Sequence, residues 1–379
     1  MKRMLVLPLF MAAFLLSCKK SGQEQAPPDP VDPPDENVVV SKVFGFDGQQ
    51  RYAYCPSVIM QGSERHVWFC GTEPAGSFND HIYYLRGDLD YASRIPKAVL
   101  APGAPGSWDN RHVCDPSIVK GEFKWNGTTY PYAMFYLGNR DGRFYNEIGV
   151  AFAQSIDADN WVKYPSQVVQ KTWDGEAEWP LGNGNAWGVG QPSAFSIDRK
   201  AKVMLTYTIG DANGTRVVLR EADLADMEDI QLSEPKKVSV AGLTQLDYST
   251  QNIVLSNADF AIDANRATVY MTSHVLPNPA SYPNFISAAV DLNMMPYDDF
   301  INGNGTWKLV KRIGPSVSGF PRNHNSGIGR DAFGIIPVLT DAELYYTVSK
   351  ADPNVAPGQG TFAEWSYNIY VCKGVDMTK

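Results

Sequence analysis

The chain has 379 residues and a formal net charge of −8; 12% of its residues are aromatic, and it contains 32 glycines and 26 prolines. The negative charge argues against nucleic acid or an anionic membrane surface as the main partner. Frequent Gly, Pro and aromatic residues favour many short strands joined by tight turns over long helices.

The first eighteen residues are typical of an export signal. A short basic region that contains Lys2 and Arg3 is followed by an apolar stretch, Leu5 to Leu16, that is too short to span a bilayer comfortably. The "LLSC" ending at Cys18 resembles the lipobox of bacterial lipoproteins, which implies lipidation of Cys18. The alternative is an ordinary cleaved signal peptide with an incidental cysteine. We expect an exported protein held on the cell envelope, at the outer membrane, by its lipid alone.

Residues 19–38 form the next predicted segment, a tether. They contain five prolines and no aromatic residue, so they cannot bury enough apolar surface to offset the entropy of ordering. Residues 39–379 are within reach of a single large all-β domain, which we expect to be monomeric.

Four cysteines lie beyond Cys18, namely Cys55, Cys70, Cys114 and Cys372. They allow three pairings, and four cysteines are too few to form a disulfide framework in a domain of this size, so we predict no required disulfide. The chain has no CxxC or HExxH spacing, and we therefore predict no zinc site and no other protein-bound metal site from motifs.

A unit of three short strands recurs five times along the chain. Each unit begins with a short phrase that places a polar or small residue before a strand, and the five phrases are "CPSVIM" from Cys55, "DPSIVK" from Asp115, "QPSAFSI" from Gln191, "ADFAID" from Ala258 with Asp259 as its opening residue, and "NSGIGRD" from Asn325. Second apolar strands follow near 66, 132, 203, 268 and 343, and third strands near 81, 147, 216, 285 and 367. Such blade-sized units predict a five-bladed β-propeller, with a β-sandwich as the alternative. The opening residues of a propeller's inner strands would converge at one end of the central axis.

These openings, together with "MFYLGN" at 134 and "IGVAFAQSIDADNWVKYP" at 148, resemble the five-bladed glycoside hydrolases of families 43, 32, 62 and 68. The resemblance implies a pocket on the axis that acts on a poly- or oligosaccharide, which we expect to be neutral or weakly charged. It also implies three carboxylates, because glycoside cleavage needs a proton donor and a nucleophile or base. The family places an Asp at the opening of blade one, an Asp at blade two and a Glu at blade three.

Only Asp115 matches that pattern, because Cys55 and Gln191 occupy the other two positions. Gln does not titrate and a buried thiol is mostly protonated, so neither replaces an acid. One hypothesis is that the chemistry has moved to other groups, with Glu178 in a glycine-rich loop as the acid and Asp115 and Asp259 sharing the base and orienting roles. A solvated loop charge is the alternative for Glu178. The remaining candidates for such groups are Asp80, His81, Asp109, Arg111, His112, Glu176, Asp247, Arg322, His324 and Asp331.

A second hypothesis is a glycan-binding propeller that has lost catalysis. Polar side chains would then bind sugar hydroxyls, and Trp108, Trp179 and Trp187 would stack on sugar faces unless they serve ordinary packing. The expected carbohydrate-binding set is Cys55, Arg111, His112, Trp187, Gln191, Arg322, His324 and Asn325. A third hypothesis makes Cys55 a thiol nucleophile activated by His112 or His324.

His324, in "NHN", has one further candidate role. The resemblance implies a His near the axis, which in some relatives lies beside a calcium ion, so His324 is the candidate neighbour of Ca²⁺. A packed, hydrogen-bonded histidine is the alternative. No cofactor is required by any of the hypotheses.

Overall fold

The computed structural model describes residues 38–46, 52–72, 79–87, 95–141, 145–173, 186–244, 254–276, 278, 286–349 and 367–378. The predicted signal segment, Cys18 and nearly all of the tether lie outside the described residues, as do Glu176, Glu178, Trp179 and Asp247. The predictions made for them stay predictions. Among the described residues no helix combines the length and apolarity needed to cross a membrane.

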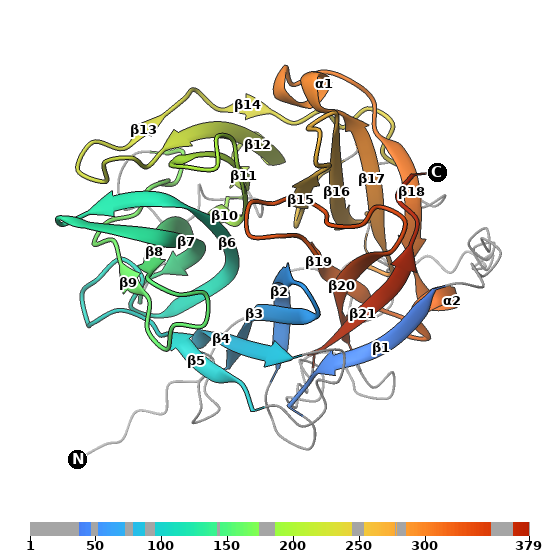
Figure 1. Cartoon of the computed structure of the whole chain (residues 1–379), viewed down its shortest axis with the longest axis horizontal. Coiled ribbons are helices and arrows are strands. Elements are labelled where there is room, and N and C mark those ends of the chain that lie inside the picture. The colour runs from blue at the N-terminus through green and yellow to red at the C-terminus, as the bar shows by residue number, and fades with distance from the viewer. Residues whose placement is uncertain are drawn as a thin grey trace, which may run out of the picture.

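Five antiparallel sheets stand in a ring around a central axis (Figure 1), which confirms the predicted five-bladed propeller. The blades are, in order, β2 (Ala53–Gln61), β3 (Glu64–Thr72), β4 (Asp80–Gly87) and β5 (Lys97–Leu100); β6 (His112–Trp125), β7 (Thr128–Asn139), β8 (Glu147–Ala153) and β9 (Val162–Lys163); β10 (Gly188–Ser196), β11 (Lys202–Asp211), β12 (Gly214–Asp223), β13 (Gln231–Leu232) and β14 (Lys236–Lys237); β15 (Asp259–Ile262), β16 (Thr268–His274), β17 (Val290–Pro296) and β18 (Lys308–Ile313); and β19 (Asn323–Ile328), β20 (Ala342–Ser349), β21 (Tyr367–Val375) and β1 (Val39–Phe44). Two short helices, α1 (Tyr297–Ile301) and α2 (Pro315–Ser318), flank β18. The third strand of blade four begins at Val290, later than the predicted position 285.

The fifth blade is built from both ends of the domain. Its outermost strand is β1, which pairs antiparallel with β21 from Val39 opposite Lys373. Blade five also meets blade one through a buried ion pair, in which Arg65 Nη2 lies 2.8 Å from Glu343 Oε1 and Arg65 Nε donates to Glu343 Oε2 at 2.9 Å. These contacts close the ring between blade five and blade one.

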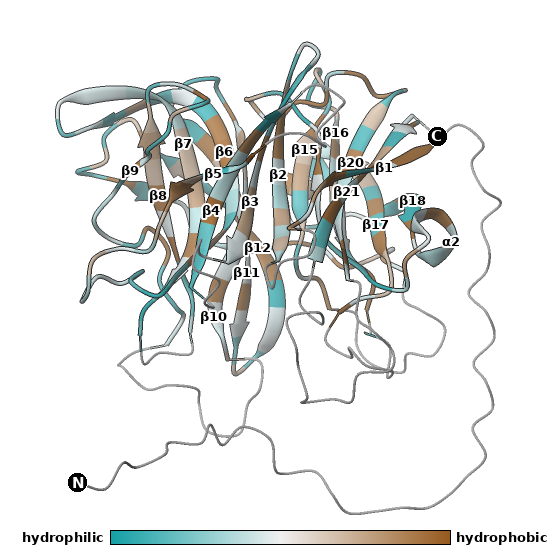
Figure 2. Ribbon diagram, turned by 90° about the horizontal axis from the view of Figure 1, so that it is seen from below, coloured by the Kyte–Doolittle hydropathy of each residue, from teal (hydrophilic) through white to brown (hydrophobic). Residues whose placement is uncertain are grey.

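The hydrophobic core lies between neighbouring blades. Phe135 and Phe152 of blade two belong to one buried cluster with Val203 and Leu205 of blade three. In Figure 2 the strands run roughly parallel to the propeller axis, and many of them carry hydrophobic stretches. Because a blade buries both faces, its middle strands are near-continuous apolar runs, as in β11, where every residue after Lys202 is buried.

Arg330, which follows β19, joins the blades at the axis. Its side chain is 1% exposed. The guanidinium donates to the backbone oxygen of Phe260, to Ser193 Oγ at 3.4 Å and to Ser117 Oγ at 3.2 Å, and it lies 3.4 Å from Asp259 Oδ1. One buried cation therefore binds groups from blades two, three and four, and the adjacent carboxylate offsets the cost of burying it.

A disulfide joins Cys70 of β3 to Cys114 of β6, and so links blade one to blade two. The sequence analysis did not identify this disulfide, and its prediction that no disulfide is required stays a prediction. The two cysteines are 44 positions apart, and only the packing of two neighbouring blades brings them together. Cys55 and Cys372 take no part in this disulfide.

Removing the disulfide in a Cys70→Ala/Cys114→Ala variant is expected to lower the free energy of unfolding by about 4 kcal/mol. The reason is that the bridge limits the entropy of a 44-residue loop in the unfolded chain. Urea unfolding measures the change. Cys372→Ala, which removes a buried sulfur without a bridge, is the matched control; a double variant as stable as this control would contradict the prediction.

Candidate functional site

Five equivalent residues open the inner strands, and all have left-handed backbone conformation. They are Cys55, Asp115, Gln191, Asn257 and Asn325, with φ between 44° and 54°. Such φ values are uncommon for residues other than glycine, cost of order 1–3 kcal/mol each and cluster at functional sites. In four of the five blades the strand register shifts at this residue, which marks a β-bulge that re-aims its side chain. We call these five the opening residues.

The opening residue of blade four is Asn257, so the prediction of Asp259 for that position is wrong by two residues. The error arose because "NADF" lacks the Pro-Ser that follows Cys55, Asp115 and Gln191. Asn tolerates the left-handed region better than most residues, and this preference was the available sequence signal.

Hydrogen bonds connect the opening residues around the axis. From blade two to blade five, the backbone N–H of each opening residue donates to a side chain of the preceding blade: Asp115 to Cys70 Sγ (2.9 Å), Gln191 to the Asp115 carboxylate, Asn257 to Gln191 Oε1 (2.9 Å), and Asn325 to His274 Nε2 (2.7 Å). Gln191 therefore has a clear positioning role, because an amide oxygen accepts this bond at any pH.

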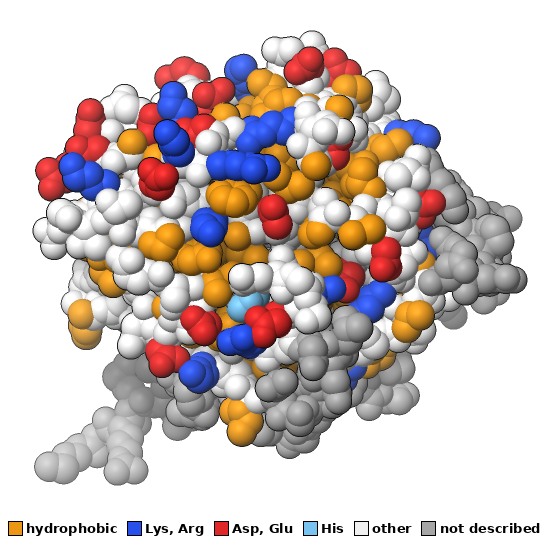
Figure 3. Space-filling view, viewed as in Figure 1, with side chains coloured by type: hydrophobic (Ala, Val, Ile, Leu, Met, Phe, Trp, Pro, Cys, Tyr) orange, Lys and Arg blue, Asp and Glu red, His pale blue; other side chains and the backbone are white. Residues whose placement is uncertain are grey.

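A pocket of about 610 Å³ lies above the opening residues, within the size range of small-molecule sites. Its lining is Tyr52, Tyr54, Cys55, Asp80, Arg111, His112, Cys114, Asp115, Leu137, Asn139, Asn146, Gln191, Asn257, His274, Ile286, His324, Asn325 and Tyr367. A narrower cavity of about 40 Å³ is lined by the same five opening residues and by the residues that follow them, including Asp259. Figure 3 shows the surface seen along the axis, where acidic and basic side chains are interspersed among hydrophobic ones.

Most of the predicted site residues meet in this pocket. The structure brings together Cys55, Arg111, His112, Asp115, Gln191, His324 and Asn325. Trp187 and Arg322 lie outside its lining. Half-buried Trp187 accepts a backbone hydrogen bond from Asn146, and the buried Arg322 donates to the Pro321 carbonyl at 3.0 Å. Their positions give no support to carbohydrate contact.

Other candidates have structural partners instead. Trp108 stacks on Tyr136 with ring centroids 5.6 Å apart, which supports packing rather than a sugar platform. The Asp109 carboxylate accepts hydrogen bonds from Lys163 Nζ at 2.5 Å and from the Tyr136 hydroxyl. Asp331 accepts backbone hydrogen bonds within its own turn, and His81 faces the Asn79 carbonyl.

Asp259 does not line the large pocket. Its Oδ1 accepts a hydrogen bond from Ser193 Oγ at 2.7 Å, its Oδ2 accepts one from the Ile328 N–H at 2.8 Å, and Arg330 lies beside it. A carboxylate with all these partners is fixed in the narrow part of the axis. Its placement therefore favours a structural role over the predicted base or orienting role.

Asp80 is the second carboxylate of the pocket. Tyr52 and Tyr54 donate hydroxyl hydrogen bonds to its two oxygens, the latter at 2.9 Å. Burial raises the pKa of Asp80 to about 7, even though these two hydrogen bonds favour the ionised form. A carboxyl group with this pKa is partly protonated at neutral pH, as a general acid must be.

Asp115 faces the same pocket from blade two. Burial raises the pKa of Asp115, and hydrogen bonds from Cys55 and from the Gln191 N–H oppose that shift. Burial, followed by the charge of Asp115, raises the pKa of the Cys55 thiol well above its ordinary value. Since the thiol's partner is a carboxylate and not a histidine, its surroundings favour the protonated form and give no support to a thiolate nucleophile.

A series of contacts bounds the distance between Asp80 and Asp115. Asp115 Oδ1 lies 3.3 Å from Cys114 Sγ, which lies 3.2 Å from the Tyr54 hydroxyl, which donates to Asp80 Oδ2 at 2.9 Å. The nearest oxygens of the two carboxylates are therefore within about 10 Å of each other, which covers the separations found in glycosidase pairs.

His112 supports Asp80 as a neutral ring. Its Nδ1 accepts the Asp80 backbone N–H at 3.1 Å. Burial, together with the charge of Arg111, lowers the pKa of His112 to about 4. The approach of Nδ1 to Asp80 Oδ2 at 3.7 Å is therefore not an ion pair at neutral pH, and the ring proton is on Nε2.

Several buried polar atoms of the pocket have no hydrogen-bond partner among the described residues. They include His324 Nε2, Asn139 Oδ1 and Asn325 Oδ1. Because unpaired buried polar atoms are costly, these three are suited to accept or donate hydrogen bonds to a ligand.

The suggested calcium ion beside His324 fits the described residues poorly. Calcium takes six to eight oxygen ligands. The ring contacts of His324 are Tyr367, with centroids 4.8 Å apart, and His274 at 6.0 Å. Burial lowers the pKa of His324, which favours a neutral ring, in agreement with the packed alternative.

The sequence analysis missed part of the pocket wall. Tyr52 and Tyr54 lie just before the opening residue of blade one, Asn139 and His274 end the second strands of blades two and four, and Tyr367 begins β21. Strand ends beside the axis share a side with the opening residues, and this rule could have identified Asn139 and His274.

Comparisons with known proteins agree on the fold. No family model matches this protein, and no curated protein matches it. Among solved structures, the BT0996 RGII complex superposes with a TM-score of 0.57 at 14% identity, covering 88% of this protein and 90% of the other. The α-L-arabinofuranosidase PaAbf62A from Podospora anserina, solved with cellotriose, gives 0.53 at 11% identity, with 88% and 94% covered. Zg3597, a family 117 glycoside hydrolase from the marine bacterium Zobellia galactanivorans, gives 0.52 at 12% identity, with 90% and 92% covered. The protein thus shares the fold of these three structures, two of which are described as glycoside-cleaving enzymes.

Proposed function

We propose that this protein hydrolyses a poly- or oligosaccharide in the axial pocket, with Asp80 as the proton donor and Asp115 as the second carboxylate. The observation that carries the proposal is a pair of buried carboxylates from neighbouring blades, within about 10 Å of each other. Similarity in fold to glycoside hydrolases adds support, although fold by itself does not fix function.

The two carboxylates take different roles because their surroundings differ. Asp80, partly protonated at neutral pH, gives its proton to the glycosidic oxygen as the bond from that oxygen to the sugar breaks. Asp115, in its ionised form, stabilises the positive charge that develops on the sugar ring. The neutral His112 holds the backbone of Asp80 in place.

The rest of the pocket suits a sugar. Tyr52, Tyr54 and Tyr367 form an aromatic group, with ring centroids 5.4 to 6.0 Å apart, whose apolar faces match the C–H face of a pyranose or furanose. His324 and Asn325 offer unpaired polar atoms to sugar hydroxyls. Glycan binding without cleavage, the alternative suggested by Cys55 and Gln191, would use the same groups.

The proposal is tested by the pH dependence of reducing-sugar release from a panel of polysaccharides. The rate is expected to fall as pH rises through about 7, because the Asp80 proton donor is lost. On the acid side the rate should rise at a pH above the ordinary pKa of aspartic acid, because burial raises the pKa of Asp115. A rate that does not fall across neutral pH would contradict the role of Asp80, and calorimetric binding with no release would favour the alternative.

A further inference from the structure

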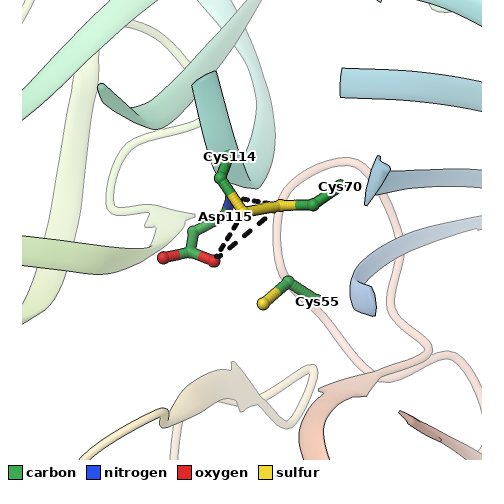
Figure 4. A group of neighbouring side chains, drawn as sticks. All are labelled: Cys55, Cys70, Cys114 and Asp115. Atoms are coloured by element: carbon green, nitrogen blue, oxygen red, sulfur yellow. Dashed lines mark hydrogen bonds between the residues drawn. A yellow bond between two sulfur atoms is a disulfide. The ribbon is translucent and has the colours of Figure 1, made fainter. Parts of the chain in front are cut away.

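We propose that Cys55, Cys70, Cys114 and Asp115 form a binding site for one thiophilic divalent cation of the zinc class when the Cys70–Cys114 disulfide is reduced. Figure 4 shows the four side chains gathered at one point, where blades one and two meet. Three sulfurs and one carboxylate oxygen are a ligand set that zinc accepts. No short sequence motif predicts this site, because its ligands come from three separate strands, β2, β3 and β6.

The spacing of the ligand atoms is close to that of a tetrahedral site. All four lie within 4.8 Å of one another, and Asp115 Oδ1 is 3.3 Å from Cys114 Sγ and 4.0 Å from Cys70 Sγ. Zinc bonds of about 2.3 Å to sulfur and about 2.0 Å to oxygen place ligands about 3.5 to 3.8 Å apart. The unbonded pairs therefore need shifts of about 1 Å, and the two bonded sulfurs separate when the disulfide opens.

A hydrogen-bond donor already points at one of the sulfurs. The Asp115 backbone N–H donates to Cys70 Sγ at 2.9 Å. A disulfide sulfur is a weak acceptor, whereas a metal-bound thiolate uses such donors to fix its orientation. Cys55 and Asp115 also hold left-handed backbone conformations, which fix the direction in which each side chain leaves its strand.

The chemistry requires a reductant, for which a phosphine serves. The phosphine supplies two electrons, the sulfur–sulfur bond breaks, and water gives its oxygen to the phosphine and two protons to the sulfurs. The cation then displaces the protons of three thiols and binds the ionised Asp115 carboxylate. Cation binding is measured without substrate, so this inference does not rest on the proposed hydrolysis. A bound cation would occupy Asp115, one of the two pocket carboxylates.

The test is a titration of the full-length protein with Co²⁺, before and after phosphine reduction, followed by visible absorption. We expect one equivalent bound per reduced molecule, with the intense bands of tetrahedral thiolate-bound cobalt, displacement by Zn²⁺, and no such bands in the oxidised protein. In reduced Cys55→Ser or Asp115→Asn, which each lose a direct metal ligand, cobalt affinity should fall by more than roughly 10–100-fold. That range is the typical cost of losing only a hydrogen bond to a metal ligand.

Cys372→Ser is the matched control, because Cys372 is buried in β21 and lies outside the cluster. This variant should bind cobalt as the wild type does. Near-UV circular dichroism of the reduced protein checks that it stays folded. The proposal is overturned if the reduced wild type shows no thiolate bands, if Cys55→Ser binds as tightly as wild type, if Cys372→Ser loses binding equally, or if the reduced protein unfolds and zinc does not restore it.

Discussion

Asp80→Asn is expected to lower the rate of glycan hydrolysis by about 10²- to 10⁴-fold, the range for loss of a general acid. The amide keeps an acceptor for the Tyr52 or Tyr54 hydroxyl but has no proton to give to a leaving group. Asp115→Asn should cause a loss of similar size, because the charge facing the sugar disappears. Initial rates of reducing-sugar release measure both, with Asp341→Asn, an exposed aspartate in the turn before β20, as the control.

The loss in Asp80→Asn is separable from unfolding. The pKa of Asp80 is about 7 in the folded chain and near 3.8 when exposed, so the folded state binds the proton more tightly. Stability is therefore lost as pH rises between these two values, and a variant that does not ionise avoids this loss. Asp80→Asn should then unfold no more easily than wild type above neutral pH. If Glu178→Gln were inactive while Asp80→Asn kept full activity, Glu178 would be the acid and our assignment wrong.

Arg330→Met is expected to lower the free energy of unfolding by about 3–5 kcal/mol. The substitution leaves Asp259 as a partly buried charge without its cation, and it removes hydrogen bonds to Phe260, Ser117 and Ser193 from three blades. Urea unfolding gives the value. Arg86→Met, which removes an exposed arginine paired with Glu64, is the control and should change stability little.

A second substitution distinguishes the two causes of that loss. Adding Asp259→Asn to Arg330→Met neutralises the unpaired carboxyl group, so part of the lost stability should return. If the single variant is as stable as Arg86→Met, then Arg330 does not hold the blades together. If the double variant recovers nothing, the cost lies in the hydrogen bonds to the blades and not in the unpaired charge.

The blade count was predictable because it rests on local pattern. The phrases after Cys55, Asp115 and Gln191 repeat Pro-Ser before an apolar run, and each is followed by two more apolar strands at regular distances. Repetition of one unit predicts stacked copies of one structure, whatever the loops do. Where the Pro-Ser pair is absent, as in "NADF", the opening residue was predicted two positions too late, at Asp259. The backbone conformation shows that Asn257 is the equivalent residue.

The pairings across blades could not be predicted in this way. No residue close to Asp80 in the sequence marks it as the partner of Asp115. Asp80 begins β4, whereas the two tyrosines that donate hydrogen bonds to it, Tyr52 and Tyr54, lie just before β2 and within β2. The same holds for β1, whose pairing with β21 joins opposite ends of the domain. Such contacts depend on how the ring closes, which no window of sequence contains.

The sequence by itself determined the five-bladed architecture and the convergence of Cys55, Asp115, Gln191 and Asn325. Only the tertiary structure decided that Asp80 lines the same pocket as Asp115, that Cys70 forms a disulfide with Cys114, and that Asp259 pairs with Arg330. The physical reason is that strand formation follows the local alternation of side chains, whereas the pKa of a carboxyl group and the pairing of a thiol depend on neighbours from other blades.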